Sequence, residues 1–179
     1  MTLRKLLHLS SAILGLFVLI LPKAWAFSGC AVALVVSAGV DLARNRGHLR
    51  FLWFLFKDRE RKRISGATAL AASYTLLAGL FPPAIAGFAM IFFSLSDPLA
   101  SFFGRFVPLF KVGSKSIGGA LSFILLGFVL SLALPEPKFY IKIVASVVGA
   151  VVELFTQDVD DNFTVPIGVG VVMLLMTWL

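Results

Sequence analysis

Seven long apolar blocks follow one another along the chain, separated by short polar or proline-containing stretches. They cover residues 6–21, 24–40, 66–81, 84–103, 120–134, 139–155 and 163–179. A helix needs about 20 mainly apolar residues to cross a bilayer, and flanking polar residues can supply the length that some blocks lack. The pattern predicts an all-α, polytopic integral membrane protein with about seven transmembrane helices.

The composition agrees with this class and excludes two others. The chain is 59% hydrophobic and only 14% charged, whereas an average soluble domain carries about 25% charged residues. A disordered chain needs low hydrophobicity and high charge, and an ordinary soluble domain of this composition would expose a very large apolar surface. We expect residues 1–179 to form a single transmembrane domain.

Two segments need a separate interpretation. The first block starts after basic residues, as a signal peptide does, but no convincing small-residue cleavage site follows it, so we expect it to be retained as the first span. The aromatic run at residues 51–56 is too short to cross a bilayer and has basic residues on both sides. It predicts a short interfacial helix, and the basic stretch that follows suits contact with anionic lipids.

The basic residues predict the orientation of the chain. With the N-terminus in the cytosol, thirteen of the 16 Lys and Arg residues fall in cytosolic segments, which leaves Lys23, Lys138 and Lys142 for the other side. This asymmetry is typical of a multi-pass protein of the cell (inner) membrane. The net charge of +7 is then explained by the phospholipid bilayer, and no nucleic-acid partner is expected.

Under this orientation, the unusual polar residues gather at the cytosolic ends of the helices. A charge at the middle of a membrane helix costs about 2.5–3.5 kcal/mol, so such a side chain is expected to face a partner, an ion or a water-filled cavity. Carboxylates from several helices beside isolated cations suit a phosphate chain with Mg²⁺, because Mg²⁺ typically takes one or two carboxylates plus phosphate oxygens and Lys and Arg neutralise the remaining phosphate charge. The acidic candidates are Asp97, Glu153, Asp160 and Asp161, and the other candidates are Lys5, His8, Arg44, Arg105, Lys115, Ser116, Gly119 and Asn162.

Several of these residues also have a purely structural interpretation. Asp97 before Pro98 suits a helix break, His8 suits a structural hydrogen bond, and Lys115 among glycines suits an ordinary positive loop. The acidic run at residues 158–162 suits a solvated turn, and it lacks the spacing of an EF-hand. The phosphate loop of soluble nucleotide-binding proteins is absent from the sequence.

Read in order, the motifs resemble the CTP-dependent lipid kinase family, which includes dolichol kinase, phytol kinase and a CTP-dependent diacylglycerol kinase. The family is distantly similar to phosphatidate cytidylyltransferases. The resemblance covers nearly the whole chain. The matching stretches are RKLLH at 4–8, DLAR at 41–44, SGAT at 65–68, SDPLASFFGR at 96–105, KSIGGA at 115–120, Glu153, and DDNFTVP at 160–166.

The resemblance implies a function and roles for the candidate residues. It implies a kinase that uses CTP and Mg²⁺ to phosphorylate the hydroxyl of a membrane lipid alcohol at the cytosolic face. The implied roles are catalysis by Asp97, Asp160, Asp161 and Lys115; metal binding by Asp97, Glu153, Asp160 and Asp161; and nucleotide or phosphate binding by Lys5, His8, Arg44, Arg105, Lys115, Ser116, Gly119 and Asn162.

The chain departs from the family's K-[ST]-x-E-G-S motif at two positions. Gly118 stands where the family has glutamate, and Ala120 stands where it has serine. One acidic ligand or acceptor is therefore missing, which keeps a catalytically silent membrane protein open as an alternative. A phosphatidate cytidylyltransferase-like CTP transferase is a second alternative. The lipid alcohol stays open among a polyprenol or dolichol, phytol or another isoprenoid alcohol, and diacylglycerol, and the small size of the chain favours an isoprenoid alcohol. The choice between CTP and UTP and the oligomeric state also stay open.

Small residues provide one hypothesis for the path of the apolar tail. They could let helices approach closely, either for ordinary packing, which is the more frequent case, or around a lipid chain. These residues are Gly79, Ala84, Ala86, Gly87, Ala145, Ser146, Gly149 and Ala150.

Overall fold

The computed structural model describes residues 3–47, 64–107, 110–113, 115–156 and 160–179. The expected interfacial helix at 51–56 lies outside these residues, as does Asp158. In chain order, the described elements are α1 (Leu3–Ser10), α2 (Ala12–Ile20), α3 (Lys23–Asn45), α4 (Gly66–Leu80), α5 (Pro83–Phe106), β1 (Lys111–Val112), β2 (Lys115–Ser116), α6 (Ile117–Ala133), α7 (Phe139–Phe155) and α8 (Asp161–Thr177). The all-α prediction is confirmed, and all seven apolar blocks are helical, with α1 and α2 together forming the first.

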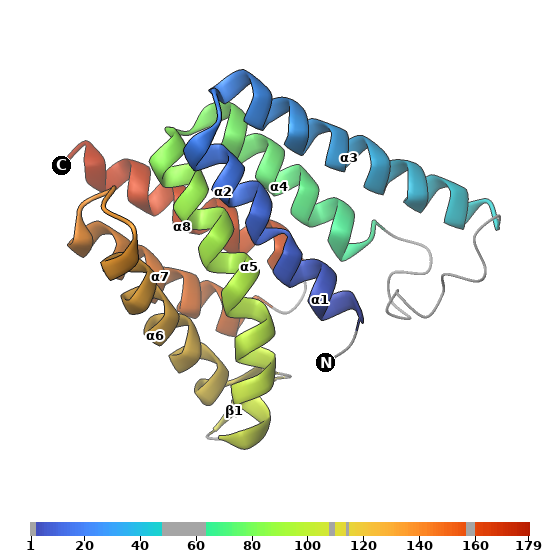
Figure 1. Cartoon of the computed structure of the whole chain (residues 1–179). Helices are drawn as coiled ribbons and strands as arrows, with labels where there is room; N and C mark the ends of the chain where they lie inside the picture. Colours follow the sequence, from blue (N-terminus) through green and yellow to red (C-terminus); the bar gives the residue numbers. More distant parts are fainter. Residues whose placement is uncertain (1–2, 48–63, 108–109, 114, 157–159) are drawn as a thin grey trace.

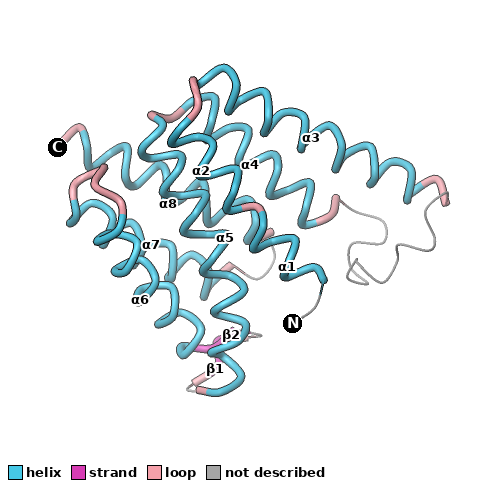
Figure 2. Tube along the Cα trace, viewed as in Figure 1, coloured by secondary structure: helices cyan, strands magenta, loops and turns pink. Residues whose placement is uncertain are grey.

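Helix α5 is the central element of the bundle (Figure 1). It contacts α1, α2, α4, α6 and α8, and its residues from Ile85 to Ser94 are buried on every side. Helices α6, α7 and α8 pack in sequence on one side of it, and α3 packs on α4 on the other (Figures 1 and 2). A helix that is apolar all round is a core helix, and α5 has this role here.

The ends of the helices follow from proline and from capping side chains. Pro22 and Pro82 precede α3 and α5, where the missing N–H of proline costs nothing. Ser65, Ser116 and Asp160 precede α4, α6 and α8, and each side chain accepts a backbone N–H of the first turn. Such caps satisfy donors that the helix itself leaves unpaired.

A short β-hairpin between α5 and α6 replaces part of what the sequence predicts as a polar loop. Strands β1 and β2 are antiparallel, with Lys111 opposite Ser116 and Val112 opposite Lys115. Gly113 has φ 61°, a left-handed conformation that glycine adopts without steric cost. The hairpin fixes where Lys115 enters the bundle.

The small residues of the bundle serve close helix packing. A Cβ atom on Gly87 would lie 2.5 Å from the side chain of Leu19, and one on Gly149 would lie 2.8 Å from Val169. Both glycines therefore bring neighbouring helices together. At these two positions, the packing interpretation of the small residues is the one that the structure supports.

Asp41, which pairs with Arg44 on the same helix, joins α3 to the start of α4 through hydrogen bonds. Asp41 Oδ2 accepts hydrogen bonds of 2.8 Å from the Ser65 backbone N–H and from Thr68 Oγ1, and Asp41 Oδ1 lies 3.3 Å from Arg44 Nη1. Two of the sequence motifs, at 41–44 and 65–68, therefore meet in one contact. It holds the first turn of α4 against α3.

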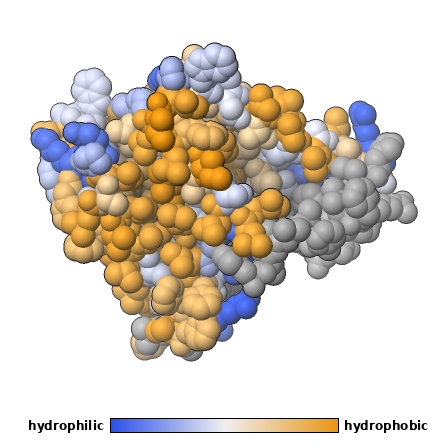
Figure 3. All heavy atoms as spheres, in the orientation of Figure 1, coloured by the Kyte–Doolittle hydropathy of each residue, from blue (hydrophilic) through white to orange (hydrophobic). Residues whose placement is uncertain are grey.

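Two described helices, α3 and α5, are long and apolar enough to cross a membrane by length and composition. Shorter apolar helices cover Lys5–Ile20, Gly66–Leu80, Ile117–Ala133 and Asp161–Thr177. Only 17% of the apolar window of α3 is buried, against 67% for α5. Figure 3 shows a face that is largely apolar, with hydrophilic residues mostly toward its edges.

Candidate functional site

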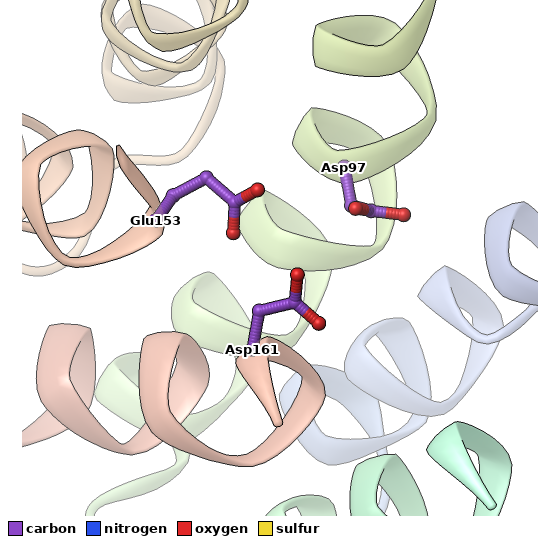
Figure 4. A group of neighbouring side chains, drawn as sticks. All are labelled: Asp97, Glu153 and Asp161. Carbon is purple, nitrogen blue, oxygen red and sulfur yellow. The ribbon is translucent and has the colours of Figure 1, made fainter. Parts of the chain in front are cut away.

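Three carboxylates from three helices lie next to one another. Asp97 comes from α5, Glu153 from the last turn of α7 and Asp161 from the first turn of α8. One oxygen of each lies within 4.8 Å of the others, and Figure 4 shows the three side chains side by side. Like charges at this distance repel one another, and a nearby cation relieves that repulsion.

Lys115 provides that cation. Its Nζ lies 2.8 Å from Glu153 Oε1 and donates a hydrogen bond of 3.0 Å to Asp161 Oδ2. The three side chains are between 10% and 18% exposed, so the interaction is only weakly screened by solvent. Burial by itself lowers the pKa of Lys115, but the carboxylates of Asp161 and Glu153 outweigh that effect and raise the pKa above its usual value. Lys115 is therefore protonated throughout the physiological range.

Helix α1 adds His8 to the group. His8 Nε2 lies 3.9 Å from Asp97 Oδ2, and its ring contacts the ring of Phe93 edge-on, with centroids 5.2 Å apart. At this distance the pair attracts when the imidazole is protonated. The site thus draws residues from both ends of the sequence, as the prediction from the polar residues requires.

A cavity of about 300 Å³ lies beside the carboxylates. Its lining includes six of the candidate residues, Asp97, Arg105, Lys115, Ser116, Gly119 and Glu153, together with Lys111. Three basic side chains therefore line a space that is also bordered by two acids. Such a mixture suits a metal-bound anion better than a bare cation or a bare anion.

Lys111 is a residue of the site that the sequence pattern does not predict. The lysine lies in β1, opposite Ser116 in the hairpin register, and this pairing brings it to the cavity. Gly113 could have indicated the hairpin, since a glycine in a short turn can join two strands.

Ser116, Gly119 and Asp160 also organise the helix ends around the site. Ser116 Oγ accepts the N–H of Gly119 at 3.1 Å, which caps α6. Asp160 Oδ1 accepts from the backbone N–H of Asn162 at 3.0 Å and from Asn162 Nδ2 at 2.6 Å, which caps α8. The described contacts thus give Asp160 a positioning role, because it fixes the turn that carries Asp161.

Six candidates are not among the described residues that line the cavity. His8 and Asp161 contact residues that do line it, and Asp160 and Asn162 lie in the turn that begins α8. Arg44 is buried against Asp41, and Lys5 lies on α1, one turn before His8. The structure brings together Asp97, Glu153, Asp161, Lys115, Arg105, Ser116, Gly119 and His8, and it places Arg44 beside Asp41 on α3.

The carboxylate group fits a hard divalent cation such as Mg²⁺. All three donors are oxygens, the kind of ligand that Mg²⁺ takes. Glu153 Oε2 is buried and has no hydrogen-bond partner among the described residues, and a buried polar atom without a partner is costly. Asp97, Glu153 and Asp161 would hold the ion.

Gly118 is required by packing. A Cβ atom at this position would overlap the backbone carbonyl oxygen of Val107 at the end of α5. The glutamate of the family motif would therefore force α5 and the start of α6 apart. The position of the motif's glutamate has no room for a side chain here. The acidic side chains of this site come instead from α5, α7 and α8.

The chain matches no protein-family model, and comparisons with curated proteins and with solved structures give no match either. The kinase family named from the sequence motifs therefore stays a resemblance.

The contact between Lys115 and Asp161 predicts a measurable coupling. In a double-mutant cycle of Lys115→Met and Asp161→Asn, we expect a coupling free energy of about 1–3 kcal/mol, because the two groups are in direct contact. Chemical denaturation in detergent micelles measures it. The matched control pairs Lys115→Met with Glu136→Gln, an exposed acid between α6 and α7, which should couple by less than about 0.5 kcal/mol. Equal coupling in the two cycles would mean that Lys115 does not pair with Asp161.

The packing of Gly118 predicts that restoring the family's glutamate is harmful. Gly118→Glu should lower the free energy of unfolding by about 1–3 kcal/mol, as expected for an overpacked site. Ala120→Ser, the other departure from the motif, should change it by less than about 0.5 kcal/mol. Unfolding of both variants in micelles checks this, and a Gly118→Glu protein as stable as the wild type would contradict it.

Proposed function

We propose that this protein transfers the γ-phosphate of CTP to the hydroxyl of a membrane lipid alcohol. The observation that carries the proposal is Lys115, which contacts Glu153 and Asp161 beside Asp97, at a cavity with further basic side chains. Phosphoryl transfer needs positioning and charge neutralisation more than covalent chemistry. CTP as the donor and the lipid alcohol as the acceptor come from the motif resemblance.

The proposal includes a membrane arrangement. We infer about seven transmembrane helices in the cell (inner) membrane, with the N-terminus and the site at the cytosolic face. The exposed apolar surface of α3 supports a lipid contact, because a soluble protein rarely leaves such a helix uncovered. A site at one end of the bundle would meet CTP from the cytosol and a lipid hydroxyl at headgroup depth.

In the proposed reaction, the alcohol oxygen attacks the γ-phosphorus of CTP. A new oxygen–phosphorus bond forms, the bond from the γ-phosphorus to the bridging oxygen breaks, and CDP leaves. The hydroxyl proton passes to the carboxylate of Asp97, whose neighbour His8 lies on the same side of the site. Mg²⁺, when bound, would neutralise charge on the phosphates.

The basic residues divide into two roles in this proposal. Lys115 has a fixed position between two carboxylates and would contact the phosphate that is transferred. Arg105 is exposed and lines the outer part of the cavity with Lys111, so these two side chains would hold the rest of the triphosphate. Arginine suits this role because its planar group binds phosphate through two parallel hydrogen bonds.

Transfer of label from CTP to a lipid alcohol tests the function. With purified protein in vesicles, Mg²⁺ and a panel of lipid alcohols, we expect label from γ-labelled CTP in the lipid and none from α-labelled CTP. Asp97→Asn and Lys115→Ala should each lower kcat about 10²–10³-fold, the usual cost of losing one stabilising group in a transition state.

Glu136→Gln is the matched control, because Glu136 is an exposed acid between α6 and α7, outside the cavity lining. It should keep the wild-type rate. Transfer of the α-label would indicate a cytidylyltransferase instead. Wild-type rates in Asp97→Asn and Lys115→Ala would end the assignment of these residues.

A further inference from the structure

A second, mainly apolar cavity of about 350 Å³ lies on the other side of His8. Its walls come from α1 and α2, from α3 and from α4, and Asn162 at the start of α8 completes it. The apolar walls include Leu7, Leu14, Ala33, Leu70 and Ala71. We call this cavity the α1–α4 groove.

The groove is elongated along the helices. On α3 the lining residues run from Ala33 to Val40, and seven residues of helix correspond to about 10 Å. Leu7 on α1 and Leu14 on α2 line the facing wall. The length on α3 is comparable with the depth of one hydrocarbon leaflet, about 15 Å.

The groove passes directly beside the carboxylate group. His8 lines it and also lies 3.9 Å from Asp97. Asn162 lines it and directly follows Asp161. From these two residues the groove continues past Leu14 and Ala33, away from the end of the bundle that carries the N-terminus. A polar group placed at His8 and Asn162 would therefore reach the site, while an apolar chain attached to it would fill the groove.

We propose that the α1–α4 groove binds the hydrocarbon chain of a lipid alcohol that has a single chain. This proposal rests on the proposed function, since it assigns the acceptor of that reaction. At about 30 Å³ for a water-sized group, 350 Å³ holds roughly a dozen carbon atoms. This volume corresponds to one chain of moderate length, and a diacylglycerol would have to leave at least one of its acyl chains outside the groove.

Activity as a function of chain length tests the proposal. The acceptors are prenyl alcohols of five to twenty carbons, straight-chain alcohols of the same lengths, and a diacylglycerol, all with γ-labelled CTP and Mg²⁺. We expect kcat/KM of the wild-type protein to rise at least tenfold with chain length and to level off near the capacity of the groove. The diacylglycerol should react at least tenfold more slowly than the best single-chain alcohol, and the two single-chain series separate isoprenoid from straight chains.

Ala33→Phe fills the part of the groove far from His8, and Val36→Phe is its control. Ala33 lines the groove and is half-buried, whereas Val36 lies three residues along α3, is 59% exposed and is not among the described lining residues. Ala33→Phe should lower kcat/KM at least tenfold for the longest alcohols and leave the five-carbon alcohol unchanged. Val36→Phe should match the wild type for every length. Ala67→Phe, on the α4 wall, is a second filling variant in case Ala33→Phe does not fold.

A photoactivatable single-chain alcohol gives a readout that does not depend on turnover. In vesicles, its label should map to groove residues by mass spectrometry, and Ala33→Phe should reduce that labelling at least tenfold. Two results would refute the assignment of the groove and leave the proposed function intact. One is transfer of the γ-label at equal rates by Ala33→Phe and Val36→Phe, and the other is a preference for the diacylglycerol. If no acceptor takes the γ-label, the proposed function fails, and the assignment of an acceptor fails with it.

Discussion

The ion pairs of Lys115 with Glu153 and Asp161 are the interaction on which the site depends. They bring together the hairpin, the end of α7 and the start of α8, three segments that repulsion between the carboxylates would otherwise separate. A second lysine, Lys142, is buried more deeply than Lys115, and its ammonium group donates to the backbone carbonyls of Ser131 and Leu134 at the end of α6. A charged side chain inside the bundle does not by itself indicate a binding site. Lys142 binds the last carbonyl groups of α6, whereas Lys115 contacts two carboxylates and lines a cavity.

The core helix α5 connects the two cavities. Its Asp97 lies between the polar cavity on the α6 side and His8 on the α1 side. Its Ser94 hydroxyl bonds to Ser11 and Tyr74, both of which line the α1–α4 groove. A nucleotide on one side and an apolar chain on the other would therefore meet at the same carboxylate. This arrangement is what a reaction between a water-soluble donor and a membrane acceptor requires.

The sequence predicted the helices well, because long apolar blocks bounded by proline and capping residues leave few alternatives. It also predicted that Asp97, Lys115, Glu153 and Asp161 gather at one end, since charges within apolar blocks need partners. It did not predict the hairpin, whose two-residue strands carry no periodic signal, and so it missed Lys111. The contacts of Asp41 with Ser65 and Thr68, and of Gly118 with Val107, join segments that are separate in the sequence, which no local pattern reveals.

Binding of Mn²⁺ together with CTP tests most directly whether the gathered charges form one site. Electron paramagnetic resonance of Mn²⁺, in place of Mg²⁺, follows the bound ion in the wild-type protein, in a Glu153→Gln/Asp161→Asn variant and in Glu136→Gln. The account predicts that the wild type and Glu136→Gln bind Mn²⁺ with CTP equally well, and that the double variant binds at least tenfold more weakly, as expected when the groups that hold a metal are lost. Equal binding by all three proteins would show that the carboxylates beside Lys115 do not hold the metal.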